Sequence, residues 1–352
     1  MIEQGVTPKN IPQELILRGQ FLALSRTHSS IFEQPLRFSL ENGTEVQIIA
    51  PGIICFEPKH SGNKDIVLSC GVHGNETAPI EICDTYVQHI LCGKIQLAHR
   101  VLFLFGNLPA MDIAQRFVEE NMNRLFSGAH SDENSPPNAE RARAKRLEDA
   151  VADFYTKANL ADERQRYHYD LHTAIRSSKN DKFAVYPFRH AKPWDKTQLQ
   201  ILLACGVNTI LLSGGATTTF SYFSSNEFGA EAFTVELGKV KPFGQNDMRQ
   251  FSQVELTLKR LMCGEDLHLR PYDPDDFYIY KVNQFINKQH ADFELKFPDD
   301  APNFSDFARG EVLATEPGIE YIAQYEGEAI VFPNAQVEIG QRALLTVIPT
   351  TI

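Results

Sequence analysis

The chain has 352 residues, of which 43% are hydrophobic and 22% are charged. This composition is typical of soluble globular proteins, and the length suffices for one large domain plus a smaller one. The formal net charge of −11 argues against nucleic acid and anionic membranes as partners, because both are bound through clustered Lys and Arg. We expect no secretory signal and no membrane-spanning helix, and six cysteines without a CxxC pair favour reduced thiols in a cytoplasmic protein.

Residues 1–45 are expected to form a mixed N-terminal cap with a short helix around residues 12–25. From residue 45 onwards, apolar runs rich in β-branched residues alternate with helical patterns. Strands are predicted over 45–56 (two strands with a turn between them), 65–69, 100–105, 167–171, 209–213 and 232–237, and helices over 78–91, 138–157 and from about 248. The alternation predicts an α/β fold in which a mixed sheet is covered by helices on both faces. Ligands of such sheets bind at the carboxyl ends of the strands.

The pattern changes after residue 270, where short alternating segments separated by turn residues replace the long helices. We therefore predict a catalytic domain over residues 1–270 and a small β-rich C-terminal domain over residues 271–352. Its strands are expected over 292–297, 310–315, 320–325, 329–332 and 343–348. Residues 271–352 contain 14 acidic and 5 basic side chains, a net charge of −9 that leaves −2 for residues 1–270. The nearly neutral first part can thus accept an anionic substrate.

Three side chains at the ends of predicted strands suit a metal ion. His73 and Glu76 lie three positions apart after the strand over 65–69, and His172 ends another strand in the segment Asp170-Leu171-His172. Two histidines and one carboxylate are a ligand set that zinc accepts, with a further position left open for water. For the His-x-x-Glu pair alone, the alternative is chance spacing of two unrelated surface residues. Asp170 is either a plain polar residue at the strand end or a group that orients the metal ligands.

Two arginines and an asparagine follow in a loop-like stretch. Asn123 and Arg124 are adjacent, and a planar guanidinium beside an amide suits a bidentate clamp on a carboxylate. Arg116 precedes them by eight residues and could polarise a scissile carbonyl group. The alternative for each arginine is a solvated surface charge.

Glu236 ends a nearly all-apolar strand in the segment Phe233–Gly238. Burying a carboxylate without a partner is costly, so its position predicts a function. It could accept a proton from an attacking water and donate one to a leaving amine. The alternative is an ordinary ion pair with Lys239 or Lys241.

Four motifs occur in a fixed order: HGNE, MNR, DLH and VELG. Together they resemble the zinc carboxypeptidase superfamily and, more closely, its succinylglutamate desuccinylase/aspartoacylase branch, over roughly residues 45–350. The resemblance implies one zinc ion per chain, bound by His73, Glu76 and His172. It further implies that Asn123 and Arg124 bind a substrate carboxylate, that Arg116 polarises the carbonyl group and that Glu236 is the general base. Tyr222 is at the position of a substrate-binding tyrosine of aspartoacylases, but Asn226 replaces the arginine expected after it.

Within that branch, the chain length and the segments SCGVHGNE and NMNRLF resemble the desuccinylases. The activity implied is hydrolysis of N2-succinyl-L-glutamate to succinate and L-glutamate, in the succinyltransferase pathway of arginine catabolism. The expected partner is a small anionic N-acyl amino acid, and homo-oligomer formation is left open. The alternatives are another N-acyl-amino-acid deacylase of the aspartoacylase kind, a peptide-trimming carboxypeptidase and a non-catalytic binding protein that retains the fold. We expect the C-terminal domain to narrow the entrance to the site.

Overall fold

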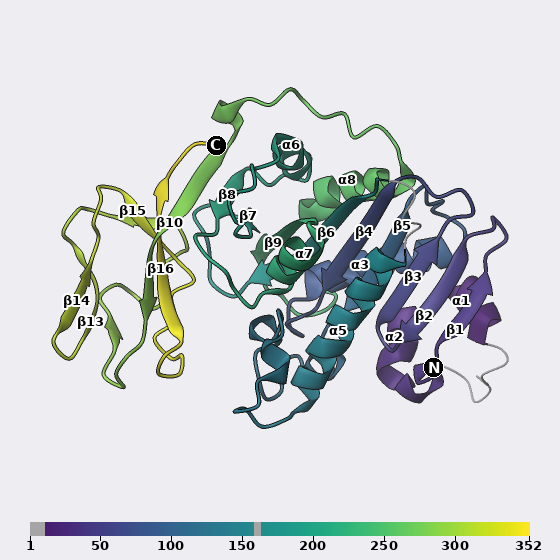
Figure 1. Cartoon of the computed structure of the whole chain (residues 1–352), viewed down its shortest axis with the longest axis horizontal. Helices are drawn as coiled ribbons and strands as arrows, with labels where there is room; N and C mark the ends of the chain where they lie inside the picture. The colour runs from purple at the N-terminus through teal and green to yellow at the C-terminus, as the bar shows by residue number, and fades with distance from the viewer. Residues whose placement is uncertain (1–10, 158–162) are drawn as a thin grey trace.

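A mixed sheet of 13 strands runs through the computed structural model, which describes residues 11–157 and 163–352 (Figure 1). Its centre consists of buried strands, of which β4 is parallel to β5 and β6, and β6 is parallel to β9. These strands are β4 (Lys64–Cys70), β5 (Arg100–Phe105), β6 (Gln165–Ala174) and β9 (Glu231–Lys239). Their apolar β-branched and aromatic side chains fill both faces of the sheet, as the sequence predicts.

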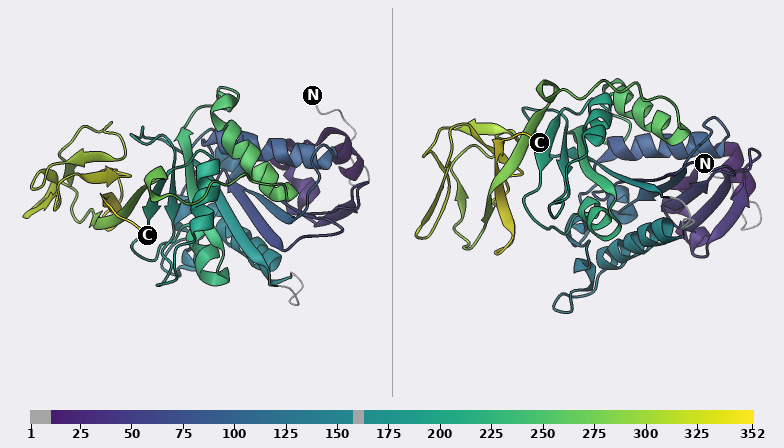
Figure 2. Two further views of the ribbon diagram at one scale, coloured as in Figure 1. Left: turned by 90° about the horizontal axis from the view of Figure 1, so that it is seen from above. Right: turned by 45° about the horizontal axis from the view of Figure 1, so that its top comes forward.

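Antiparallel strands flank this centre on one side, and short strands continue the sheet on the other. The first group is β1 (Leu36–Ser39), β2 (Glu45–Ala50) and β3 (Ile53–Glu57), and the second is β7 (Phe183–Tyr186) and β8 (Thr209–Leu212). β7 is antiparallel to β9 and parallel to β8. The N-terminal strands therefore lie at one end of the sheet and the C-terminal strands at the other (Figure 2).

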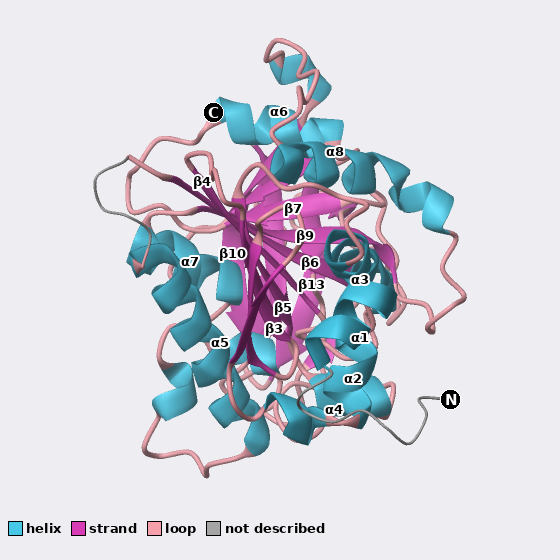
Figure 3. Cartoon of the chain, turned by 90° about the vertical axis from the view of Figure 1, so that its right-hand side faces the viewer, coloured by secondary structure: helices cyan, strands magenta, loops and turns pink. Residues whose placement is uncertain are grey.

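Helices cover both faces of the sheet (Figure 3), which confirms the predicted fold class. One face carries α1 (Ile11–Arg18), α2 (Phe21–Thr27), α3 (Thr77–Leu91), α4 (Leu108–Asp112), α6 (Lys196–Ala204) and α8 (Ser252–Cys263), and the other carries α5 (Ala139–Thr156) and α7 (Phe220–Phe228). Short 3-10 helices are η1 (Ser29–Phe32), η2 (Met122–Arg124), η3 (Ala129–Ser131), η4 (Met248–Phe251) and η5 (Pro274–Asp276). Within the described ranges, none of the helices is long and apolar enough to cross a membrane.

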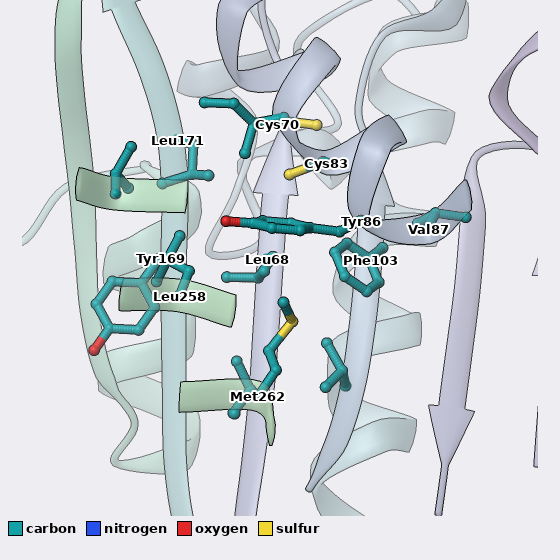
Figure 4. Close-up of a cluster of buried hydrophobic side chains, with 14 of the residues drawn as sticks. Leu68, Cys70, Cys83, Tyr86, Val87, Phe103, Tyr169, Leu171, Leu258 and Met262 are labelled. Atoms are coloured by element: carbon teal, nitrogen blue, oxygen red, sulfur yellow. The ribbon is translucent and has the colours of Figure 1, made fainter. Parts of the chain in front are cut away.

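The larger hydrophobic core lies between the sheet and helices α3 and α8. Tyr86 of α3 lies beside Leu68 of β4, and Leu258 and Met262 of α8 belong to the same cluster (Figure 4). This packing holds the N-terminus of α3 at the end of β4.

The helix expected around residues 12–25 is two helices, α1 and α2, separated at Gly19. Gly19 has a φ of +67°, and a Cβ there would lie 2.5 Å from Cγ of Gln88. A left-handed glycine in close contact with α3 therefore ends α1.

Beyond α8, the chain adds four strands to the main sheet and forms a second, three-stranded antiparallel sheet. The four are β10 (Tyr278–Asn287), β12 (Ser305–Phe307), β15 (Glu328–Val331) and β16 (Arg342–Pro349), and the three are β11 (Glu294–Leu295), β13 (Val312–Glu316) and β14 (Ile319–Ile322). β10 is not among the strands that the sequence pattern predicts, because its exposure does not alternate regularly. It pairs in parallel with β8, so the sheet continues across the boundary predicted near residue 270.

Candidate active site

The ends of β4 and β6 bring three candidate metal ligands together. β4 and β6 pair in register, with Cys70 opposite Leu171, so His73 just after β4 lies beside His172 near the end of β6. Glu76 precedes the first residue of α3, and its carboxylate completes the group. One ligand atom from each of the three side chains lies within 4.8 Å of the others, and all three are buried.

Each histidine ring has one nitrogen turned outward to an acceptor and one turned inward to Glu76. His73 Nε2 contacts Asn121 Oδ1 at 2.9 Å, and His172 Nε2 contacts Asp170 Oδ2 at 2.9 Å. Because both outer contacts are acceptors, the outer nitrogens can donate to them, which leaves Nδ1 as the metal-binding atom of each ring. The Nδ1 atoms face the Glu76 carboxylate at 2.7 and 2.8 Å. Two imidazole nitrogens and a carboxylate oxygen around one point fit a zinc ion, whose ligating histidines are commonly oriented by such acceptors.

The pKa values of the three candidate ligands are consistent with a cation bound between them. Burial lowers the pKa of His73 to about 4, so its ring is neutral near pH 7. Burial acts to raise the pKa of Glu76, but the two histidines outweigh it and hold that pKa well below its usual value. For His172, the carboxylates of Asp170 and Glu76 outweigh burial and raise the pKa. The centre therefore stabilises positive charge.

Arg116 lies beside the candidate ligands. Its Nη1 donates to Glu76 Oε1 at 2.9 Å, and a third of its side chain is exposed. Its backbone oxygen accepts a hydrogen bond from Gly74 N at 3.1 Å. A Cβ on Gly74 would lie 2.2 Å from the carbonyl carbon of Ala110, which is why glycine is required between His73 and Glu76.

A buried carboxylate holds the loop over residues 116–124 in place. Glu140, in the first turn of α5, accepts hydrogen bonds from the backbone N–H groups of residues 118–120 at 2.6–2.8 Å and from Asn107 Nδ2 at 2.7 Å. An ion pair between Arg141 and Glu120 at 2.6 Å adds a second link to α5. The positions of the loop side chains are therefore determined by α5.

Asn123 and Arg124 differ in their surroundings. Asn123 is buried, and its Oδ1 accepts from Phe220 N of α7 at 3.4 Å. Arg124 is open to solvent, yet protein atoms surround its guanidinium closely enough that desolvation lowers its pKa to about 9, with added repulsion from Arg342 and Arg116. Apart from a bond to the backbone oxygen of Asn123, Arg124 has no partner among the described residues. Its charge is thus available to an anion.

Glu236 lies opposite His172 in the pairing of β6 with β9. It is only 7% exposed, and its Oε2 atom has no hydrogen-bond partner within the described part of the chain. Burial and the negative charge of Glu76 raise its pKa to about 7. No described ion pair joins it to Lys239 or Lys241, the alternative considered from the sequence. A carboxyl group with a pKa near neutrality suits proton transfer in both directions.

Comparison with known proteins assigns the family. The model of the succinylglutamate desuccinylase/aspartoacylase catalytic domain matches residues 62–262, and that of the AstE/AspA barrel-sandwich hybrid domain matches residues 275–350. The chain belongs to the succinylglutamate desuccinylase/aspartoacylase family. Members of this family named succinylglutamate desuccinylase are hydrolases that act on an amide.

Similar members of the family are known from both sequence and structure. The succinylglutamate desuccinylase of Pseudoalteromonas atlantica is 60% identical over 99% of both chains, and that of Idiomarina loihiensis is 50% identical over 94% of this chain and 96% of its own. The crystal structure of succinylglutamate desuccinylase from Chromobacterium violaceum has a TM-score of 0.83 at 37% identity, covering 94% of this chain and 98% of its own. The enzyme from Vibrio cholerae has a TM-score of 0.84 at 34% identity, covering 94% of both chains.

The structure of this family member brings His73, Glu76 and His172 together, with Arg116 bound to Glu76 and Glu236 opposite His172. Tyr222, on α7, contacts His190 Nε2 at 2.9 Å and Asn226 Oδ1 at 3.4 Å. Neither contact belongs to the group formed by His73, Glu76 and His172, so a substrate-binding role for Tyr222 stays a prediction.

Several residues that support the site were missed from the sequence. Asn121 is one, although it adjoins the MNR motif. Behind Asp170, Ser69 Oγ contacts both Asp170 Oδ1 at 2.5 Å and His168 Nε2 at 2.8 Å. From its spacing, His168 is expected in a surface or core position, and it is a buried core residue with a second contact to Ser224 at 2.7 Å. The alternation of side chains along β4 and β6 could have indicated this contact, because Ser69 and Asp170 are paired in register and their side chains lie on the same face of the sheet.

Proposed function

We propose that this family member hydrolyses N2-succinyl-L-glutamate to succinate and L-glutamate with one zinc ion bound by His73, Glu76 and His172. One observation carries the hydrolytic chemistry: Glu236, buried and with its Oε2 atom unpartnered within the described residues, lies opposite His172, one of three converging metal-ligand side chains. The substrate assignment is supported by the full-length similarity to relatives of that name. The reaction would belong to the succinyltransferase pathway of arginine catabolism, and we propose a cytoplasmic location.

The side chains of the site divide the work of amide hydrolysis. When bound, zinc would supply Lewis acidity that polarises the scissile carbonyl group and makes water more acidic. Glu236 takes a proton from the attacking water, whose oxygen forms the new bond to the acyl carbon. Glu236 then gives that proton to the glutamate nitrogen as the carbon–nitrogen bond breaks. The pKa of about 7 of this carboxyl group suits both transfers.

The arginines provide charge where the substrate is anionic. Arg116, bound to Glu76, stabilises negative charge that develops on the carbonyl oxygen. Asn123 and Arg124 hold a substrate carboxylate, and the absence of a carboxylate partner for Arg124 among the described residues supports this role. Tyr222 is a further candidate for substrate contact.

The experiment compares three substrates on purified, zinc-loaded protein: N2-succinyl-L-glutamate, N-acetyl-L-aspartate and a peptide with a free C-terminus. We expect selective cleavage of the first. Glu236→Gln should lower kcat by about 10³-fold while zinc content stays at one ion per chain, and Glu265→Gln, an exposed control, should have no effect. Near-normal turnover by Glu236→Gln, or protein that binds no zinc, would show that the proposed mechanism is wrong.

A further inference from the structure

Arg342 is a cation without an anionic partner. It is one of only five basic side chains in residues 271–352, and it is the first residue of β16. Its Nε atom is buried and has no hydrogen-bond partner, and no ion pair joins the side chain to any residue that the structure describes. Its guanidinium lies 6.0 Å from the ring centroid of Phe332. The stacking orients the group but does not neutralise its charge.

Arg342 lies in the part of the C-terminal strands that contacts the segment after β6, the strand that carries His172. Desolvation is the main cause of the lowered pKa of Arg124, and the positive charge of Arg342 lowers it further. Two hydrogen bonds make this connection. Just beyond β6, Arg176 donates to the backbone oxygen of Pro333 at 3.1 Å, and Asn334 N in turn donates to the backbone oxygen of Ala343 at 2.7 Å. The end of the strand that carries the ligand histidine is thus linked to the residue next to Arg342.

The attachment of the C-terminal strands makes this position rigid. β16 pairs with β10, which pairs with β8 of the main sheet (Figure 1). On the other side, Lys179 forms an ion pair with Asp306 at 2.5 Å, and Asn303 N donates to the backbone oxygen of Ser177 at 2.8 Å. The backbone that carries Arg342 is therefore held in place before any ligand binds, which reduces the entropy cost of binding.

The most buried arginines among the described residues have carboxylate partners, and the half-buried Arg143 and Arg166 donate to backbone oxygens. Arg100 is paired with Asp65 at 2.8 Å, and Arg141 with Glu120 at 2.6 Å. Two neighbouring guanidinium groups without an anion are unfavourable in a partly desolvated place, and a bound carboxylate would relieve both the repulsion and the loss of hydration.

We propose that Arg342, contributed by the C-terminal strands, binds a second substrate carboxylate next to the one held by Arg124. The inference rests on the proposed function and deepens it, because it makes the C-terminal region a determinant of specificity for multiply anionic N-acyl amino acids. The carboxylate is either that of the acyl chain or that of the glutamate side chain, and both present the same planar group to the arginine.

The test compares the wild-type protein with Arg342→Gln on three substrates: N2-succinyl-L-glutamate, N-butyryl-L-glutamate, which lacks the acyl carboxylate, and N2-succinyl-L-glutamine, which lacks the side-chain carboxylate. For succinylglutamate we expect kcat/KM to fall by about 100-fold, mainly through KM. For the analogue that lacks the carboxylate bound by Arg342, the substitution should have little effect, and this analogue identifies the carboxylate. Equal loss on all three substrates, or no loss, would overturn the inference.

Two controls separate a binding role from a structural role. Arg309→Gln removes an exposed arginine of the same region and should leave all three rates unchanged. Arg342→Gln should melt no lower than the wild type, because it removes an unpaired charge, and Arg342→Lys should restore part of the lost activity. A variant that melts well below the wild type and is not rescued by lysine would contradict the inference.

Glutarate, a dicarboxylate that cannot be hydrolysed, tests Arg342 independently of turnover. We expect the Kd measured by calorimetry to rise at least about 10-fold in Arg342→Gln. If the wild type fails to hydrolyse succinylglutamate but glutarate binding still depends on Arg342, the proposed function fails and the anion site stands. If glutarate binds equally to both proteins, the anion site is refuted even where hydrolysis is intact.

Discussion

Replacing Glu140 by glutamine tests how the loop over residues 116–124 is held beside the candidate metal site. The carboxylate is 3% exposed and accepts four hydrogen bonds, three from the backbone of residues 118–120 and one from Asn107. Glutamine has nearly the same shape, but it keeps one acceptor oxygen and turns an NH2 group toward donors. The substitution therefore removes the charge and leaves buried N–H groups without acceptors.

The expected loss in the free energy of unfolding can be worked out from these hydrogen bonds. A hydrogen bond to a charged group contributes about 1.5–3 kcal/mol, and an unsatisfied buried group costs a similar amount. With about half of the four bonds retained, we expect the free energy of unfolding to fall by about 3–5 kcal/mol. Burial acts to raise the pKa of Glu140, but its hydrogen bonds outweigh burial and lower it. The contribution of Glu140 is therefore complete above its unfolded-state pKa and is lost as the pH falls through its lowered folded-state pKa.

Urea unfolding of the wild type, Glu140→Gln and the exposed control Glu133→Gln measures this difference at about pH 7.5 and again in acid. The difference in the free energy of unfolding between the wild type and Glu140→Gln should be smaller in acid. The control should match the wild type at both pH values. KM should also rise in Glu140→Gln, because the loop carries the arginines. A loss of less than about 1 kcal/mol at neutral pH would refute the reasoning.

Three further predictions concern the metal ligands, a buried acid and a close backbone contact. Asp170→Asn should weaken zinc binding about 10- to 100-fold, measured by competition with a chelator, because it removes the charge that orients His172; an unchanged Kd would contradict this. Burial raises the pKa of Asp84 to about 6, so the fold favours its neutral form, and Asp84→Asn should stabilise the protein by about 2 kcal/mol above pH 7 but not below about pH 4. Gly74→Ala should destabilise it by about 3 kcal/mol in thermal unfolding, because its Cβ would overlap the backbone at Ala110; a wild-type Tm would show that α4 can move away.

The sequence alone was sufficient to predict the α/β fold and the candidate chemistry of the site. Apolar runs mark the buried strands, and the polar residues that end these runs mark the edge where ligands bind. His73, His172 and Glu236 each follow or end such a run. Because parallel strands place their carboxyl ends at one edge, the convergence of these side chains follows from strand order, and β4, β6 and β9 are neighbours in the sheet.

Only the tertiary structure decided which residues support that edge from a distance. Nothing local in the sequence distinguishes Glu140 from other acidic residues in the first turn of a helix, since its role depends on where a separate loop packs. The role proposed for Arg342 depends on the pairing of β10 with β8 and of β16 with β10, and no period or spacing encodes either pairing. Local patterns specify each strand and its end, whereas the approach of one strand to another depends on side chains far apart in the chain. The predicted chemistry therefore came from the motifs, and the proposed determinants of substrate choice came from packing.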